Sequence, residues 1–176
     1  MPKVNIPYNN ITSFIKDNIF KMCDKLIHKR KQQCVKANGY NSTFNSEHMC
    51  AILDSDGNPL IYGTNVYNIG KLSTEHAEAQ ALRKLYDKYS YQNQKRKIKV
   101  DIIVVRTNGS NSKPCDRCIR EMKCSTRLHI RNVYYTHQDA DFGIRCVKFD
   151  RLVEDPDRHY SSYDRNVRRS YLRLHN

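Results

Sequence analysis

The stretch VDIIVVRTNGSNSKPCDRC, residues 100–118, decides the fold class of this chain. It opens with an aliphatic run over residues 100–105 that is broken only by Asp101, and such a run is typical of a strand covered on both faces. A Gly-Ser-Asn loop follows, and Pro114 then stands where a helix favours its first residue. The sequence therefore predicts a strand in the middle of a sheet, followed by a helix over residues 115–124.

A second helix is predicted before the central strand. Ser73 or Thr74 can cap a helix that begins at Glu75, and this helix ends in the polar segment 90–99. Four apolar residues recur at helical spacing and point toward a core: Ala77, Ala81, Leu82 and Leu85. The tripeptide His76-Ala77-Glu78 is therefore expected in the first helical turn.

The outer parts of the chain supply one more helix and two hairpins. Apolar residues between Ile11 and Ile27 recur at three- and four-residue steps, which predicts an amphipathic helix. Residues 49–53 and 60–66 flank a turn rich in Asp, Gly and Asn and should form a hairpin. Residues 130–135 and 144–149 are too close together for a parallel crossover, so they should form an antiparallel hairpin. This order of elements predicts an α/β protein with helices on both faces of its sheet.

Length and charge describe one basic domain of ordinary size. The chain has 176 residues, enough to bury a core without disulfides. We expect a single domain over residues 1–154 and a basic, Arg- and Tyr-rich tail over residues 155–176. The formal charge of +13 would attract the phosphates of nucleotides or nucleic acid, although an AT-rich coding sequence would produce a similar composition.

The cysteines and the hydropathy pattern bear on the compartment. Seven cysteines form an odd, scattered set, and the first ten residues are polar rather than typical of a signal peptide. We therefore expect an intracellular, reducing compartment, either the cytoplasm or the nucleus. No apolar run approaches the length that spans a bilayer, so no membrane role is expected.

Two motifs on either side of the central strand carry the chemistry. His-Ala-Glu stands at 76–78 and Pro-Cys-Asp-Arg-Cys at 114–118, and this combination is the signature of zinc-dependent nucleobase deaminases. Cys115 and Cys118 are three residues apart, so on a helix they share one face and can hold one ion. With His76 they make a three-ligand set whose fourth position is left for water, as at catalytic zinc sites.

Glu78 completes this set as the expected proton shuttle. As a carboxylate that lies near the metal without ligating it, Glu78 can take a proton from water and return it to the base and the leaving ammonia. Zinc lowers the pKa of its water from about 15.7 toward about 7, which provides a nucleophile at neutral pH. The expected reaction is attack on C4 of a cytosine-type base, which gives uracil and ammonia.

Other interpretations of the cysteines stay open. Cys115 and Cys118 could join Cys124 and a histidine in a closed structural zinc site, and a Cys-x-x-Cys pair alone could be a redox dithiol. At its spacing, Cys124 more often packs in a core than binds a metal. The remaining cysteines are expected to be buried, and no partner can be named for three histidines: Cys23, Cys34, Cys50 and Cys146, and His48, His129 and His137.

At the two motifs the chain resembles the cytidine deaminase-like superfamily, over roughly residues 49–149. The resemblance implies a three-layer α/β/α sandwich with a five-stranded mixed sheet, and one Zn²⁺ at His76, Cys115 and Cys118 beside Glu78. The short hairpin between the last two strands resembles the branch of free-cytidine and blasticidin-type deaminases, which also includes toxin-type deaminases of nucleic acid. The resemblance also leaves a homo-oligomer open, with subunit contacts that help to close the pocket.

The segment Gly63-Thr64-Asn65-Val66-Tyr67-Asn68 resembles the stretch with which free-cytidine deaminases hold the ribose. The resemblance makes Asn65 a candidate partner of a sugar hydroxyl. Tyr67 stands where that motif has a glutamate, and His76 replaces the cysteine that those enzymes use as their first ligand. Loss of the acidic residue removes repulsion of a phosphate, so a nucleotide or a polynucleotide becomes more credible than a free nucleoside.

The sequence therefore predicts a zinc-dependent hydrolase that deaminates a cytosine-type base of a nucleoside, a nucleotide, or single-stranded DNA or RNA. Two basic segments that contain tyrosines, residues 86–99 and 158–173, could follow a phosphate backbone and stack on bases, or could be ordinary solvated surface. Two alternatives are a nucleic-acid-binding module with a structural zinc site, and a deaminase of adenine or guanine.

Overall fold

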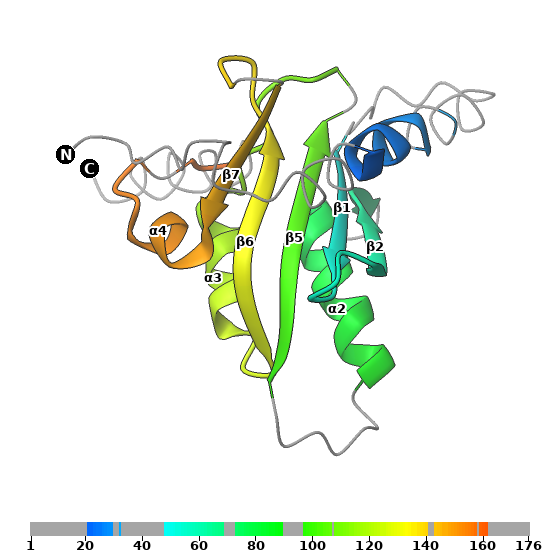
Figure 1. Ribbon diagram of the computed structural model, residues 1–176, viewed down its shortest axis with the longest axis vertical. Coiled ribbons are helices and arrows are strands. Elements are labelled where there is room, and N and C mark those ends of the chain that lie inside the picture. The colour runs from blue at the N-terminus through cyan, green and yellow to red at the C-terminus, as the bar shows by residue number, and fades with distance from the viewer. Residues whose placement is uncertain are drawn as a thin grey trace.

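The computed structural model describes residues 21–29, 32, 48–68, 73–89, 97–106, 108–140, 143–157 and 159–161. Its main feature is a five-stranded sheet in the order β2-β1-β5-β6-β7, with β5 in the middle (Figure 1). The bounds are β1 His48–Leu53, β2 Pro59–Thr64, β5 Ile98–Arg106, β6 Leu128–Thr136 and β7 Ile144–Lys148. The pair β5–β6 is parallel and the other three pairs are antiparallel, so the sheet is mixed.

Both predicted hairpins and the central strand are confirmed. β1 and β2 are joined by a turn in which Asp54 Oδ1 accepts hydrogen bonds from the backbone N–H groups of Asp56 (2.9 Å) and Asn58 (2.8 Å). β6 and β7 pair antiparallel across their short connection. In β5 all residues from Val100 to Val105 are buried, because both faces of this strand are covered.

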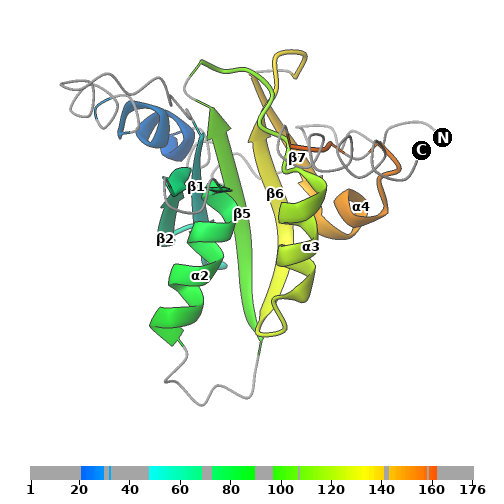
Figure 2. The ribbon, with the colours of Figure 1, turned by 180° about the vertical axis from the view of Figure 1, so that it is seen from behind.

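Helices cover both faces of the sheet, which confirms the three-layer α/β architecture. α2 (Ala77–Tyr89), α3 (Asp116–Cys124) and α4 (Phe149–Glu154) pack on one face, and the helical residues 21–29 pack on the other (Figures 1 and 2). The predicted first helix is thus present over residues 21–29, and its part from Ile11 to Phe20 lies outside the described residues. Within the described ranges, no helix is both long enough and apolar enough to cross a bilayer.

Alternate residues of β5 supply the two cores, because successive side chains of a strand point to opposite faces. Val100, Ile102 and Val104 pack against α2 and α3 in the larger core. Ile103 and Val105 pack on the other face, against the helical residues 21–29. We call the face of Val100, Ile102 and Val104 the α2/α3 face.

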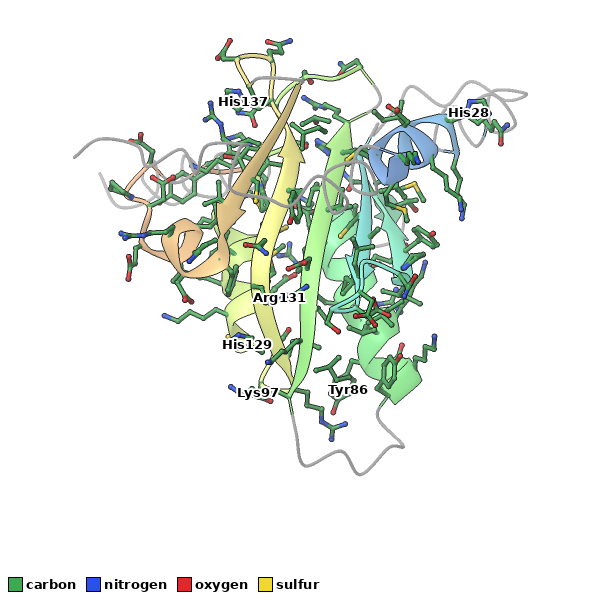
Figure 3. All side chains as sticks on the ribbon, viewed as in Figure 1. His28, Tyr86, Lys97, His129, Arg131 and His137 are labelled. Atoms are coloured by element: carbon green, nitrogen blue, oxygen red, sulfur yellow. The ribbon has the colours of Figure 1, made fainter. Side chains whose placement is uncertain are left out.

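A buried ion pair explains the one charged residue in the aliphatic run. The carboxylate of Asp101, whose residue is 6% exposed, accepts hydrogen bonds from Arg131 Nη2 at 2.6 Å and Nε at 3.2 Å. It also accepts bonds from the backbone and side-chain N–H groups of Asn132. Arg131 lies across the face of β6 that is opposite α2 and α3 (Figure 3). These contacts compensate the carboxylate for its lost hydration.

The start of α2 differs from the prediction. Residues Ser73–Glu75 form the short strand β4, which pairs antiparallel with β3 (Val66–Asn68), and α2 begins only at Ala77. The backbone N–H of Ala77 donates to Asn65 Oδ1 at 2.7 Å. A side chain 12 positions upstream therefore satisfies the helix end, and the local caps Ser73 and Thr74 are not needed for it.

The starts and ends of two later elements also differ. α3 begins at Asp116, with Cys115 as its N-cap in extended conformation and Pro114 outside the helix, so the predicted start at 115 is wrong by one residue. The last strand ends at Lys148, and Phe149 opens the helix α4, which the sequence did not predict. Six residues are too few to show a helical period, and α4 is held by the burial of Phe149 and Leu152 in the larger core.

The connection from β2 to α2 depends on a glycine. A Cβ added at Gly63 would clash with the backbone oxygen of Ala77 and would lie 2.7 Å from the backbone nitrogen of Ala81. Both contacts are with backbone atoms, which cannot rotate away. Gly63 therefore lets β2 approach the first turns of α2. This close contact fixes the position of His76, the residue directly before Ala77.

Candidate metal centre and active site

Two helix beginnings meet at the carboxyl end of β5. Figure 2 shows α2 and α3 side by side on the α2/α3 face, both running opposite to β5. His76 is the residue directly before α2, Cys115 is the N-cap of α3, and Cys118 lies in the first turn of α3. The fold therefore brings together residues that are about 40 positions apart in sequence, as the two motifs predicted.

The three predicted metal ligands form a compact triangle. His76 Nδ1 lies 3.2 Å from Cys118 Sγ and 3.4 Å from Cys115 Sγ, and the two sulfur atoms lie 3.5 Å apart. A tetrahedral zinc ion with bonds of about 2.0–2.3 Å would separate such ligand atoms by about 3.6–3.8 Å. Among the residues that the structure describes, these three are the group of His, Cys, Asp and Glu side chains that could hold a metal ion. Their chemistry and spacing fit zinc.

The same contacts polarise the three side chains. The hydrogen bond that Cys115 shares with Cys118, and then its bond with His76, lowers the pKa of Cys115 well below its ordinary value. The bond with Cys115, together with burial, raises the pKa of Cys118. The bond with Cys115 also raises the pKa of His76. The triangle thus already favours a thiolate at Cys115, and a cation bound there would favour thiolates at both cysteines.

Glu78 lies beside this triangle in a buried position. It belongs to the first turn of α2, is 6% exposed, and makes a hydrogen bond with the Cys118 side chain. Burial raises the pKa of Glu78 to about 7. Burial, and then the charge of Glu78, raises the pKa of Cys50 in β1, so this thiol lies close to the Glu78 carboxylate. A carboxyl group with a pKa near neutrality, next to a metal-binding triangle, is suited to accept and return a proton.

Asn65 has a structural contact that the sequence did not indicate. Its Oδ1 accepts the Ala77 N–H at 2.7 Å, and its Nδ2 lies 3.5 Å from His48 Nδ1. Asn65 thereby holds the start of the helix that carries Glu78, and it lies at the edge of the same site. Tyr67 belongs to β3, and its side chain lies outside what the structure describes.

The prediction for Cys124 is wrong, whereas two other cysteines are buried as expected. Cys124 ends α3 and is exposed, because the six residues after Cys118 carry it to the far end of the helix. It does not belong to the metal-binding triangle, so it provides no fourth ligand for a closed site. Cys23 and Cys50 are buried, Cys146 is half-buried, and Cys34 lies outside the described residues.

The segment after α4 returns to the start of α3, a contact that sequence reasoning missed. Lys113 Nζ donates to Asp155 Oδ2 at 2.8 Å and to the backbone oxygen of Asp157 at 2.9 Å. The backbone N–H of Asp116 donates to the His159 oxygen at 2.7 Å. These bonds hold Asp155, Asp157 and His159 next to Lys113 and Asp116, the residues on either side of the 114–115 pair. Nothing in the local pattern of residues 155–161 distinguishes them from a solvated tail.

The first of the two basic segments lies away from the triangle. Tyr86 and Lys97 are found at the amino end of β5, at the opposite end of the sheet from His137 (Figure 3). Ten residues of α2 separate Tyr86 from His76, which is about 15 Å along a helix axis. Tyr86 is 60% exposed, and the Arg127 guanidinium lies 5.4 Å from the centre of its ring. Residues 90–96, 158 and 162–173 of the two segments lie outside the described part of the chain.

Comparison with known proteins points to one family. The model described as "Cytidine and deoxycytidylate deaminase zinc-binding region" matches residues 24–137 of this chain. That range covers more than half of the 176 residues and includes His76, Glu78, Cys115 and Cys118. No curated protein matches the sequence.

Several solved structures are similar to this chain. A cytidine deaminase from Burkholderia pseudomallei is 22% identical, with 77% of this chain and 98% of that chain covered and a TM-score of 0.48. A cytidine deaminase from Mycobacterium tuberculosis is 21% identical, with 78% and 97% covered and a TM-score of 0.45. The enzyme from Mycobacterium leprae is 20% identical, with 75% and 97% covered and a TM-score of 0.41.

Proposed function

This chain belongs to the family of cytidine and deoxycytidylate deaminases that share a zinc-binding region, and on that basis we propose that it deaminates a cytosine-type base carried by a nucleotide or by single-stranded nucleic acid. The family is one of zinc-dependent hydrolases, so the general activity follows from membership. The proposal adds the roles of individual residues and the substrate class. His76, Cys115 and Cys118 hold the zinc, and Glu78 moves the protons.

One observation carries the proposal. Three ligand atoms lie within 4.8 Å of one another at two helix starts, and the buried carboxylate of Glu78 stands beside them without belonging to the set. A structural zinc site would need a fourth protein ligand, and Cys124 is at the other end of α3. Three ligands and a separate proton carrier are what hydrolytic chemistry requires.

Each of these residues has a separate role in the proposed reaction. Zinc held by the triangle supplies the Lewis acidity that makes water a nucleophile at neutral pH. Glu78 accepts a proton from the attacking water and delivers it to N3 of the base. After the C4–O bond has formed, Glu78 takes a second proton from the hydroxyl on C4 and gives it to N4, so the C4–N4 bond breaks, ammonia leaves and the C4 carbonyl of uracil remains. Asn65 keeps Glu78 in place by holding the first N–H of α2 at 2.7 Å.

The substrate class follows from charge. Tyr67 stands where a free-nucleoside enzyme of the similar branch has a glutamate that grips the sugar. Without that carboxylate, a phosphate near the sugar meets no repulsion from this position, and a chain with formal charge +13 attracts it. A nucleotide or a single-stranded nucleic acid is therefore preferred over a free nucleoside.

A panel of substrates tests this proposal. Zinc-loaded protein should release ammonia and form uracil from CMP, dCMP, single-stranded DNA or single-stranded RNA at a higher kcat/KM than from cytidine. Adenosine and guanosine compounds serve in the same assay as controls for the base. Conversion of purines alone would mean a purine deaminase. Binding to single strands without any ammonia release would favour the nucleic-acid-binding module, and conversion of cytidine alone would reject the phosphorylated substrate.

Two further expectations accompany the function. The two ligand thiols lie 3.5 Å apart and would be open to oxidation without metal, so we propose a reducing compartment such as the cytoplasm or nucleus. A homo-oligomer stays a prediction, and light scattering on the zinc-loaded protein measures it. The division into a domain over residues 1–154 and a tail over 155–176 is likewise a proposal.

A further inference from the structure

We propose that Arg106 is the residue that selects a phosphorylated substrate, by binding a phosphate group attached to the cytosine nucleoside. The inference rests on the proposed function, because it names which side chain of the same site recognises the substrate's phosphate. No motif at Arg106 marked it in the sequence.

Arg106 is the last residue of β5, and β5 points its carboxyl end toward the starts of α2 and α3 (Figure 2). Alternate residues of a strand share a face, so Arg106 lies on the α2/α3 face with Val100, Ile102 and Val104. This is the face on which the metal-binding triangle lies. Arg106 thus stands at the edge where the sheet ends and the candidate active site begins.

Strand register brings Arg106 close to the catalytic set. Across the β1–β5 pair, His48 lies opposite Arg106 and Cys50 lies opposite Val104. The charge of Glu78 contributes to the raised pKa of Cys50, so these two side chains lie close together. Arg106 lies two residues beyond Val104, which is about 7 Å further along β5.

A second chain of contacts reaches the same place. His48 Nδ1 lies 3.5 Å from Asn65 Nδ2, and Asn65 Oδ1 accepts the N–H of Ala77, which directly follows the ligand His76. Arg106 thus lies at the same end of the sheet as His48, Asn65 and the start of α2, where it can meet the sugar-phosphate side of a substrate.

The guanidinium of Arg106 makes a hydrogen bond but is not paired with a carboxylate among the described residues. Its Nη1 donates to Ser110 Oγ at 3.0 Å, whereas its Nε is buried and has no hydrogen-bond partner among the described residues. Within the same part of the chain, no carboxylate forms an ion pair with it. Buried donors are rarely left unpaired in folded proteins, so this guanidinium keeps hydrogen-bonding capacity that the described residues do not use.

The loop after β5 holds this arrangement. The backbone N–H of Gly109 donates to the Arg106 oxygen at 3.0 Å, which closes a turn, and Gly109 adopts a φ of 72° that suits glycine. Asn108 Oδ1 accepts hydrogen bonds from the N–H and the hydroxyl of Ser110, at 3.0 and 2.8 Å. Ser110 is therefore oriented to accept the bond from Arg106, and the guanidinium is positioned before any ligand arrives.

Three other cations near the metal-binding triangle or on the helices that follow it are already paired with carboxylates. Lys113 contacts Asp155 at 2.8 Å, Arg117 contacts Glu121 at 3.0 Å, and Arg83 contacts Glu75 at 2.9 Å. Arg106 differs from these three because the partner of its guanidinium is a hydroxyl. A planar guanidinium presents parallel N–H groups that match two oxygens of a phosphate, so it is well suited to this anion.

Binding measurements on two variants test the proposal. In the Glu78→Gln background, which prevents turnover, Arg106→Gln should weaken binding of CMP by about 10- to 100-fold and leave cytidine binding within about 2-fold, as measured by calorimetry. Arg106→Lys keeps the positive charge but loses the planar pair of N–H groups. Its affinity for CMP should therefore lie between that of the parent with Arg106 and that of Arg106→Gln. Arg151→Gln, an exposed substitution on α4, is the matched control and should change neither affinity.

A further ligand distinguishes binding of a phosphate monoester from binding of a phosphodiester. A short single-stranded oligonucleotide with one cytosine and no terminal phosphate presents diesters only, whereas CMP presents a monoester. Whichever of the two loses affinity in Arg106→Gln identifies the phosphate that this residue binds.

Three outcomes would overturn the inference: equal weakening of cytidine and CMP, no change for either CMP or the oligonucleotide, or no measurable binding of any phosphorylated ligand by the parent protein. The proposed function fails separately, if the protein with Glu78 intact releases no ammonia although phosphate binding depends on Arg106.

Discussion

Replacing Glu78 with glutamine should reduce turnover by about a hundred- to ten-thousand-fold while leaving the zinc content unchanged. Glutamine has nearly the shape of glutamate but cannot carry a proton between water, the base and ammonia. Glu78 lies outside the triangle of His76, Cys115 and Cys118, so its replacement removes no ligand. Ammonia release under saturating substrate measures the loss, and elemental analysis of the same sample measures the metal.

The matched control for this variant is Glu154→Gln, which makes the same chemical change at an exposed carboxylate on α4. It should retain the activity of the parent protein. Unchanged turnover in Glu78→Gln would remove this residue from the mechanism. Loss of zinc along with turnover would instead make Glu78 part of the metal site, and the role as a separate proton carrier would be wrong.

Replacing Cys115 with serine should remove zinc and lower the stability of the fold. Cys115 is 4% exposed and is the N-cap of α3, where its sulfur lies 3.4 Å from His76 Nδ1 and 3.5 Å from Cys118 Sγ. A serine hydroxyl is a far weaker zinc ligand than a thiolate, and metal bound only by the folded state contributes to folding free energy. Zinc content should fall from about one per chain to a small fraction of that.

Cys124→Ser provides the control on the same helix. Cys124 is exposed at the last residue of α3 and does not belong to the triangle, so this variant should keep both its zinc and its melting temperature. Added zinc should raise the melting temperature of the parent protein and of Cys124→Ser, but not that of Cys115→Ser. Full zinc occupancy in Cys115→Ser would show that the metal has other ligands.

Local patterns predicted much of this structure. The aliphatic run 100–105 identified the central strand because burial on both faces leaves little room for polar side chains, and Asp101 fits only through its pair with Arg131. The two hairpins followed from turn chemistry and from a connection too short for a crossover. The metal-binding triangle was predicted from the two motifs, because one histidine and a Cys-x-x-Cys pair together form the ligand set of a catalytic zinc site.

The features that the sequence did not indicate depend on contacts between distant segments. α2 begins at Ala77 because Asn65 caps it from another segment, and no window around Ser73 contains that information. Cys124 is exposed at the last residue of α3, and its exposure depends on which segments pack around that helix end. Asp155, Asp157 and His159 make hydrogen bonds with Lys113 and Asp116, although their segment resembles a solvated tail in sequence.

Arg106 illustrates the same limit for function. In the sequence it is one of 31 lysines and arginines, and nothing local distinguishes it. Arg106 becomes a candidate ligand-binding residue only in the folded structure. There it is the last residue of β5 on the α2/α3 face, and its Nε is buried without a partner among the described residues. The proposed role of Arg106 in substrate selection thus depends on tertiary placement, whereas the zinc-dependent reaction was predicted from motifs that a sequence can show.

X-ray absorption at the zinc edge on the purified protein reports the ligands of the metal itself, and therefore shows whether His76, Cys115 and Cys118 share one ion. We expect about one zinc per chain with two sulfur neighbours at about 2.3 Å and two nitrogen or oxygen neighbours at about 2.0–2.2 Å, one of them from His76. Cys115→Ser or His76→Ala should change this shell. A shell of four protein sulfurs, or a protein that takes up no zinc at neutral pH, would contradict a catalytic site shared by the starts of α2 and α3.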